Sequence, residues 1–151
     1  MAASDLPIKL IAPSDELQWA AYHDIRRRVL FEGRGQYGIY DPNHADERKS
    51  GNHPLILMNG NDFIGVVRVD LSGDLAQLRR VAIDEVWQRQ GFGRHLLALA
   101  EQFGAARGAK RVESAVAPDA VRFYEKCGYR SGETADGSSS VRMAKSVVPR
   151  A

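Results

Sequence analysis

The sequence is poor in cysteine, and Cys127 is the only one among its 151 residues. A single thiol excludes an internal disulfide and any metal site built from several cysteines. Cys127 directly precedes Gly128 at the expected end of a helix, and no histidine lies near it in the sequence. This setting favours a packed structural thiol over a catalytic nucleophile.

Long apolar runs and runs of like charge are also missing. No stretch approaches the roughly 20 apolar residues of a membrane helix, and residues 1–5 lack the layout of a signal peptide. We therefore expect a cytoplasmic protein with no membrane association. The net charge of +2 argues against nucleic acid as a partner. His44, Asp46, Glu47 and His53 lack a compact ligand spacing, so no metal is expected.

What the chain does contain is enough apolar residues for a core, at 44% of the sequence. Its length fits one domain over residues 1–151. Apolar periodicity and turn signals predict the order β-α-β-β-β-α-β-α-β-β. This order indicates an α/β (α+β) fold, in which a mixed, mostly antiparallel sheet carries helices on both faces. The expected strands cover 8–11, 53–58, 63–71, 75–83, 111–117 and a final pair within 129–148; the expected helices cover 14–30, 91–107 and 118–127.

Two connections stand out in this pattern. The run Asn59-Gly60-Asn61-Asp62 predicts a tight hairpin, because Asn-Gly tolerates the positive φ that such turns require. Residues 32–52 contain four glycines and Asp41-Pro42-Asn43, which predicts a loop or broken helix. A connection of about 20 residues is long for a compact domain, and such loops are often functional.

The junction between the strand 75–83 and the helix that follows has the pattern of an anion site. The first N–H groups of a helix have no partner within it, and the helix dipole adds positive potential there. Gly91 and Gly93 let an anion approach without a Cβ in the way. Gln88, Arg89 and Arg94 can add side-chain donors. Taken alone, the two glycines are equally consistent with tight packing of the helix on the sheet.

Two other phosphate-binding motifs are excluded by the residues present. The run Gly-x-x-x-x-Gly-Lys-Ser/Thr of the P-loop does not occur in the sequence. The dinucleotide fingerprint needs a third glycine three residues after the second, and position 96 is leucine. The predicted antiparallel strands before the turn also differ from the βαβ unit that this fingerprint requires.

Two signatures in order then resemble those of the GNAT superfamily of acyl-CoA N-acyltransferases. The first reads Leu78-Arg79-Arg80-Val81-Ala82-Ile83, then Gln88-Arg89-Gln90-Gly91-Phe92-Gly93-Arg94 and Leu96-Leu97. The second reads Ala120-Val121-Arg122-Phe123-Tyr124-Glu125-Lys126-Cys127-Gly128-Tyr129. The close match covers residues 75–130, and the N-terminal half matches mainly in its element order.

The resemblance implies that acetyl-CoA is the acyl donor and that no metal takes part. The start of the helix would bind the pyrophosphate of CoA, and the strand before it would pair with the pantetheine arm. A backbone N–H near Ile83 would polarise the thioester carbonyl as an oxyanion donor does. The predicted cofactor-binding residues are Val81, Ala82, Ile83, Gln88, Arg89, Gln90, Gly91, Phe92, Gly93 and Arg94.

Tyr124 matches the general acid of the family. A tyrosine has a pKa of about 10 and a cysteine-like leaving thiol about 8.5, so proton donation is uphill by roughly 2 kcal/mol. The alternative role for Tyr124 is a buried aromatic packed beside Phe123. An amine must also lose a proton before it attacks. The sequence does not identify the base, and Asp46, Glu47 and Asp70 are left as alternatives to plain surface carboxylates.

The chain departs from the family pattern at three places. Ala117 stands where many members have an asparagine that bonds pantetheine, Arg89 stands where glycine is common, and Asp84-Glu85 replaces a common Asp-Pro. None of these changes removes a group that the reaction requires. The missing asparagine leaves a catalytically silent acyl-CoA-binding sensor as the alternative to an N-acetyltransferase, although the presence of Tyr124 argues against a sensor. Homodimers are common in the family, so a homodimer is also an expectation.

The acceptor implied by the resemblance is a primary amine, on a small molecule or on a protein. In the family the acceptor binds near the segment Phe31 to Asn52. Five residues there would favour a cationic acceptor: Tyr37, Tyr40, Asp41, Asp46 and Glu47. A purely structural lid explains the same segment equally well.

Overall fold

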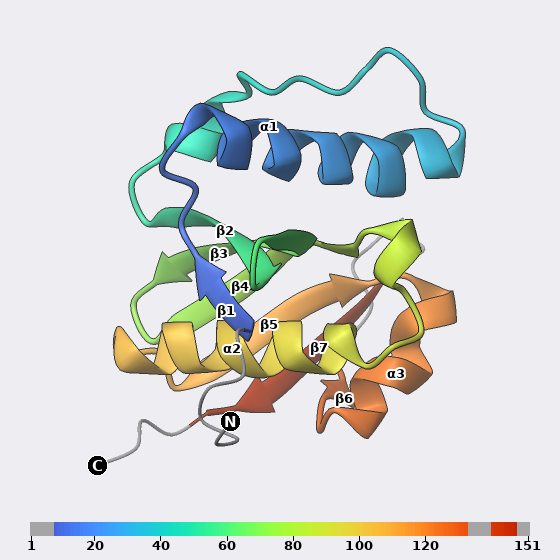
Figure 1. Cartoon of the computed structure of the whole chain (residues 1–151). Helices are drawn as coiled ribbons and strands as arrows, with labels where there is room; N and C mark the ends of the chain where they lie inside the picture. Colours follow the sequence, from blue (N-terminus) through green and yellow to red (C-terminus); the bar gives the residue numbers. More distant parts are fainter. Residues whose placement is uncertain (1–7, 133–139, 148–151) are drawn as a thin grey trace.

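A seven-stranded sheet in the order β1-β2-β3-β4-β5-β7-β6 forms the centre of the molecule (Figure 1). The computed structural model describes residues 8–132 and 140–147. Neighbouring strands are antiparallel except for the parallel pair β4 and β5, which confirms a mixed, mostly antiparallel sheet. The strands are β1 (Ile8–Ile11), β2 (Asn52–Asn59), β3 (Asp62–Ser72), β4 (Leu75–Ile83), β5 (Arg111–Val116), β6 (Arg130–Ser131) and β7 (Val141–Ser146).

Helices cover both faces of this sheet, as the sequence predicts. The helix α1 (Glu16–Ile25) lies over one face, and α2 (Phe92–Ala106) and α3 (Val121–Lys126) lie over the other (Figure 1). The order of the elements is confirmed. Short 3₁₀ turns lie within the connections between these elements: η3 (Glu32–Arg34), η4 (Ala45–Arg48), η5 (Glu85–Trp87) and η6 (Pro118–Ala120).

The first helix begins as the sequence predicts but changes its geometry before it ends. The side chain of Asp15 accepts a hydrogen bond of 2.7 Å from the backbone N–H of Gln18, which fixes the N-terminus. After Ile25 the helix widens into a π-helical segment η2 (Arg26–Phe31). The helical segment thus ends at Phe31, close to the predicted end near residue 30. Its π-helical geometry was not predicted. Wide turns of this kind often occur at functional sites.

The sheet separates the buried apolar residues into two clusters. The larger one lies between the sheet and α2 with α3, and it includes Leu96, Leu97 and Ala100 of α2. The smaller one lies beneath α1 and consists of Tyr22, Ile25, Ile56, Val66 and Ala82 with partly buried neighbours. Because β3 is buried on both faces, its sequence is almost continuously apolar.

Element boundaries differ from the prediction by small amounts. The strand β4 has the predicted bounds, and β5 ends one residue early, at Val116. The helix expected from Pro118 begins with η6 and becomes α-helical only at Val121. The polar turn expected between the last two strands falls on residues 132–140, of which 133–139 lie outside the described residues.

Candidate active site

The strands β4 and β5 diverge halfway along β4. They pair in parallel only from Leu75–Leu78 against Arg111–Ser114. Beyond this point β5 continues to Val116 with β7 as its partner, whereas β4 pairs only with β3. We call this point the fork. Residues 81–83 of β4 thus have backbone groups with no strand partner on the β5 side, where an extended ligand can add to the sheet.

A bulge in β4 coincides with the fork. The register between β3 and β4 shifts between Val66 and Arg68, and Arg80 opposite this shift has a left-handed φ of 58°. An extra residue in one strand bends that strand and increases its local twist. The bulge therefore accounts for the separation of β4 from β5.

The backbone of Ile83 is directed toward the open side of the fork. The N–H of the next residue, Asp84, donates to the carbonyl of Ile64 on β3 at 2.8 Å. Successive residues of an antiparallel strand point their backbone groups in opposite directions, so the N–H and C=O of Ile83 face away from β3. The carbonyl accepts a hydrogen bond of 2.9 Å from Nε2 of Gln88.

The helix α2 begins without a side-chain cap. Its N-cap residue Gly91 has φ 88°, and no side chain bonds to the first turn. The first N–H groups of α2 are therefore open to an anion. Gly93 has a packing role, because a Cβ there would lie 3.0 Å from Cζ of Phe123 on α3. The packing explanation therefore holds for Gly93, and the anion site at Gly91 stays a prediction.

The side chains around this helix start divide into two groups. Nε2 of Gln88 bonds the carbonyl of Ile83, and Nε2 of Gln90 bonds the carbonyl of Val86 at 3.2 Å. Gln88 therefore stabilises the turn, and its role as a donor around the phosphate stays a prediction. Arg89 and Arg94 are exposed and make no hydrogen bond or ion pair with other residues in the described ranges, so both guanidinium groups are available to an anion.

Tyr124 places its hydroxyl at the fork. The residue is 7% exposed, and its ring packs edge-on against Phe123 and Tyr129 with centroid distances of 5.8 and 5.3 Å. Burial raises the pKa of Tyr124 above its ordinary value, and a hydrogen bond with Ser114 opposes the shift. Oγ of Ser114 also donates to the carbonyl of Leu78 at 3.3 Å. Since Leu78 is the last residue of β4 paired with β5, Ser114 ties Tyr124 to the point of divergence.

The remaining sequence candidates lie in settings that limit their chemistry. Burial raises the pKa of the Cys127 thiol, which disfavours the thiolate that a nucleophile needs. The side chain of Glu47 is bonded by Arg26 and by the hydroxyl of Tyr22, and that of Asp70 by Arg68. Among residues 8–132 and 140–147, no three His, Cys, Asp or Glu side chains gather in a group that could hold a metal ion.

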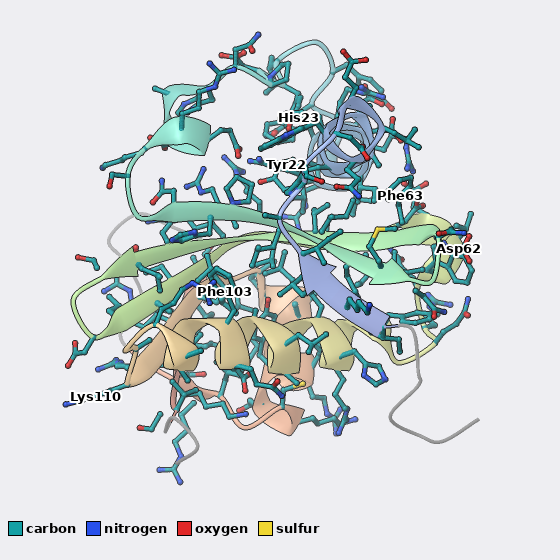
Figure 2. All side chains as sticks on the ribbon, turned by 60° about the vertical axis from the view of Figure 1, so that its left-hand side comes forward. Tyr22, His23, Asp62, Phe63, Phe103 and Lys110 are labelled. Carbon is teal, nitrogen blue, oxygen red and sulfur yellow. The ribbon has the colours of Figure 1, made fainter. Side chains whose placement is uncertain are left out.

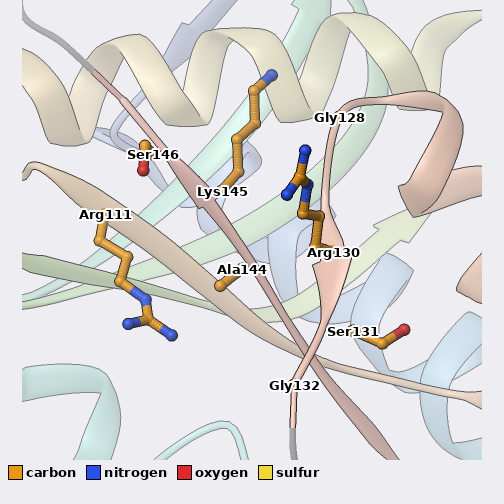
Figure 3. A pocket seen from close by; sticks show the side chains of 8 residues that line it. All are labelled: Arg111, Gly128, Arg130, Ser131, Gly132, Ala144, Lys145 and Ser146. Carbon is orange, nitrogen blue, oxygen red and sulfur yellow. The ribbon is translucent and has the colours of Figure 1, made fainter.

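A hollow of about 560 Å³ lies elsewhere, at the strands β5, β7 and β6 (Figure 3). Lys145 in its wall reaches toward α2, where its Nζ bonds Glu101 at 2.9 Å. None of the predicted cofactor-binding residues lines this hollow. Sequence reasoning also missed Ser114 and Arg80 at the fork, because a serine in a strand and an arginine at positive φ carry no local signal.

The sequence profile described as the acetyltransferase (GNAT) family matches residues 19–129. The matched segment contains the fork, the uncapped helix start and Tyr124. The chain belongs to the acetyltransferase (GNAT) family. This confirms the resemblance seen in the two sequence signatures, and the mixed sheet with its flanking helices is the fold of this GNAT family.

Known proteins of similar sequence and structure support the GNAT assignment. A candidate acetyltransferase of Bacillus subtilis (strain 168) is 25% identical over 146 residues, which are 91% of this chain and 95% of the relative. The crystal structure of a candidate N-acetyltransferase from Lactobacillus plantarum has a TM-score of 0.77 and 28% identity, and the match covers 93% of this chain and 99% of that chain.

A second solved structure of similar fold contains CoA. Spermidine N-acetyltransferase from Vibrio cholerae, in complex with CoA and spermine, has a TM-score of 0.73 at 16% identity, with coverage of 93% of this chain and 95% of that chain. At this identity the likeness concerns the fold alone. In the part of this chain that the structure describes, no helix has the length and apolar character needed to cross a bilayer.

Proposed function

We propose that this chain is an N-acetyltransferase that moves an acetyl group from acetyl-CoA to a primary amine by direct attack. The observation that carries the proposal is the position of Tyr124. Its hydroxyl is buried at the fork through Ser114, and the fork is continuous with the turn leading to the uncapped start of α2. One surface thus combines an anion site, an open strand edge and a proton donor.

The residues present fit the acyl donor. The N–H groups of residues 91–94 and the guanidinium groups of Arg89 and Arg94 would hold the pyrophosphate of CoA. The open backbone edge at residues 81–83 would pair with the pantetheine arm. Phe92 and Gln90 complete the turn around the anion. When bound, acetyl-CoA supplies the activated acyl group, and the residues of this chain orient it.

The chemistry then depends on two groups of the chain. As the amine nitrogen bonds to the acyl carbon and the bond from carbon to sulfur breaks, the N–H of Ile83 stabilises the charge on the acyl oxygen. Tyr124 donates a hydrogen bond and then its proton to the departing sulfur. Because burial raises the pKa of Tyr124, complete transfer of its proton to the sulfur is less favourable than the ordinary pKa of tyrosine implies. Hydrogen bonding to the thiolate is therefore its main contribution.

The amine must lose a proton, and we assign no side chain as the base. Glu47 and Asp70, which the sequence left as alternatives, are both held by arginines. A carboxylate whose oxygens are already occupied by guanidinium groups is a weak proton acceptor. Asp46 lies in the exposed 3₁₀ turn η4 beside His44. The proton can leave directly to water if the acceptor site itself favours the neutral amine.

Acetyl transfer is tested by following thiol release from acetyl-CoA with a panel of amines, with CoA binding measured separately by calorimetry. We expect saturable CoA binding and amine-dependent thiol release, with an N-acetylated product identified by mass spectrometry. CoA binding without turnover on any amine in the panel would contradict the proposal and favour a binding protein. If the protein does not bind CoA, the assignment of acetyl-CoA as the acyl donor is wrong.

A further inference from the structure

Three arginines from different elements gather beneath α1 and the segment that follows it. They are Arg26 on η2, Arg68 on β3 and Arg80 in the β4 bulge, and we call them the arginine cluster. Tyr22 and His23 of α1 lie beside it, between α1 and η4 and above the sheet (Figure 2). No local pattern predicts that these arginines lie together, because they are distant from one another along the chain.

Aromatic rings contact two of these guanidinium groups, those of Arg26 and Arg80. Cζ of Arg26 lies 5.0 Å from the centre of the Tyr22 ring and 5.6 Å from that of Tyr40. The rings of Tyr40 and Phe31 pack edge-on at 5.1 Å, and Cζ of Arg80 lies 5.2 Å from the centre of Phe31. Nδ1 of His23 and the hydroxyl of Tyr40 share a hydrogen bond of 2.5 Å. Arg26 and Arg80 therefore lie against one group of packed aromatic rings.

Carboxylates do not balance the charge of the cluster. Glu47 is bonded by Arg26 and lies 3.8 Å from Arg68. Asp70 is bonded by Arg68 through two hydrogen bonds of 2.7 and 2.8 Å, and it is shared with Arg79 outside the cluster at 3.4 Å. Arg80 has no carboxylate partner in the described ranges. Positive charge is thus in excess at this place.

Two further observations indicate that an acceptor of hydrogen bonds is missing. Arg26 is only 4% exposed, and its Nε has no partner among the described residues. A buried donor without a partner is unfavourable. Partial burial and the neighbouring Arg26, Arg68 and Arg79 lower the pKa of Arg80, and Arg26 also contributes to lowering the pKa of His23. A negatively charged ligand beside Arg80, the exposed member of the cluster, would relieve the repulsion among the arginines.

The cluster also lies beside the proposed reaction centre. Arg80 immediately precedes Val81, the first of the β4 residues with an open backbone edge. Arg28 in η2 bonds Asp84 at 3.0 Å and Glu85 at 3.1 Å, which fixes η2 against the end of β4. A small acceptor bound at the cluster would therefore have its remaining groups close to Ile83 and the fork.

We propose that the acceptor is a primary amine that also carries a carboxylate, as an amino acid does, and that the arginine cluster binds this carboxylate. The proposal rests on the acetyl transfer proposed above. Guanidinium groups form paired, charge-assisted hydrogen bonds with carboxylates. Neighbouring positive charges also favour the neutral form of an amine, which supplies a nucleophile without a dedicated base.

This assignment replaces the cationic acceptor expected from the sequence. That expectation rested on Tyr37, Tyr40, Asp41, Asp46 and Glu47. The fold places Glu47 in contact with Arg26 and near Arg68. Asp41 bonds the backbone of Asn43 at the loop surface instead, and Tyr37 is 71% exposed. A polyamine would meet the same repulsion that the arginines exert on one another.

The proposal is tested by comparing standard L-amino acids with their carboxamides as acceptors, so that each pair differs only in the negative charge. For the preferred side chain we expect kcat/KM to favour the carboxylate by roughly tenfold or more, as for a charge-assisted hydrogen bond. Arg80→Met should abolish most of this ratio. Arg111→Met, a matched loss of one exposed arginine far from the cluster, should leave the ratio unchanged.

A binding measurement separates failure of this inference from failure of acetyl transfer. N-acetyl amino acids and their amides are titrated into the protein saturated with CoA, with and without Arg80→Met. Binding of the carboxylate forms that depends on Arg80 supports the site even if no amine is acetylated. Equal use of carboxylates and amides, preference for spermidine, or preference for an aminoalkyl phosphate over the matching amino acid would overturn the inference while acetyl transfer stands.

Discussion

Tyr124 is predicted to act as a proton and hydrogen-bond donor. Burial raises the pKa of Tyr124 above its ordinary value, which favours the protonated hydroxyl that a donor needs. Tyr124→Phe removes the hydroxyl and keeps the ring packing, so we expect kcat to fall by roughly 10²- to 10⁴-fold, the range for a general acid. The KM for acetyl-CoA should change little, and both constants are measured by thiol release.

The matched control is Tyr129→Phe. This residue is also buried, but its hydroxyl bonds Glu101 on α2 at 2.8 Å, away from the fork. Its loss should lower stability by about 1 kcal/mol with little effect on kcat. Equal rates in Tyr124→Phe and the unchanged protein would show that Tyr124 is only a packed aromatic.

Arg89 combines backbone strain with a predicted ligand contact. It has a φ of 64°, which disfavours a residue with a Cβ by roughly 1–2 kcal/mol. Glycine removes this strain and loses about 0.5–1 kcal/mol of chain entropy. Arg89→Gly should therefore raise stability by up to about 1 kcal/mol, measured by urea unfolding, while the KM for acetyl-CoA rises about fivefold as one cation is lost.

Arg94→Gln distinguishes the two effects of Arg89→Gly. Arg94 lies within the first turn of α2, so its replacement removes a cation without relieving strain. We expect a similar rise in the KM for acetyl-CoA and no gain in stability. A gain in stability without any change in KM for Arg89→Gly would count against its contact with the pyrophosphate.

Arg28 connects two elements that frame the proposed acceptor site. Its guanidinium bonds Asp24 on α1 and also Asp84 and Glu85 beyond β4, and the hydrogen bond with Asp84 is the main cause of its raised pKa. Arg28→Met should lower the free energy of unfolding by about 1 kcal/mol, since the network is partly exposed and screened. The KM for the amine should rise more than that for acetyl-CoA.

Arg27→Met is the comparison for this element. Arg27 is adjacent, and its ion pairs with the described residues are those with Asp24 and Glu32, which are close to it in sequence. Its loss should leave both KM values near those of the unchanged protein. If the two variants raise the acceptor KM equally, the contact between η2 and β4 has no special role in acceptor binding.

The sequence predicts the strand β4 at the fork but not its bulge or its separation from β5. Alternating and turn residues predicted β4 with the bounds that the structure has, Leu75–Ile83. The bulge at Arg80 was not predicted, because arginine carries no preference for positive φ. The separation of β4 from β5 depends on the pairing of three strands, which sequence periodicity does not specify.

For the whole molecule, buried tyrosines set the alkaline limit of stability. Burial raises the pKa of Tyr22 to about 12, and the pKa values of Tyr40 and Tyr124 are also raised. The folded protein thus holds these protons more tightly than the unfolded chain. The resulting stability is complete below pH 10 and is lost as the pH rises toward 12, by on the order of 2 kcal/mol for Tyr22.

Thermal unfolding across this pH range provides the measurement. The melting temperature should fall steeply above pH 10, and Tyr22→Phe should reduce the steepness while lowering stability at neutral pH, because Arg26 and Glu47 lose a partner. Tyr37→Phe, at a 71% exposed position, should leave the curve unchanged. A flat curve up to pH 12 would show that tyrosine burial does not limit stability.

Several properties follow from the sequence without a structure. Local signals suffice for the N-cap at Asp15, the order of the elements and the bounds of β4, because each depends on neighbours along the chain. The two signatures likewise determined the GNAT family. A single domain, a cytoplasmic location and a homodimer stay predictions from composition and resemblance.

Only the tertiary structure determined which arginines are buried and which pair with distant carboxylates. In the run Arg26-Arg27-Arg28 the three residues are chemically identical, and nothing local separates them. The fold buries Arg26 against Glu47, 21 residues away, directs Arg28 to Asp84, 56 residues away, and leaves Arg27 exposed. Burial and charge pairing depend on which distant segments meet. A local motif could therefore predict the proposed cofactor site from the sequence, whereas nothing local predicts the arginine cluster.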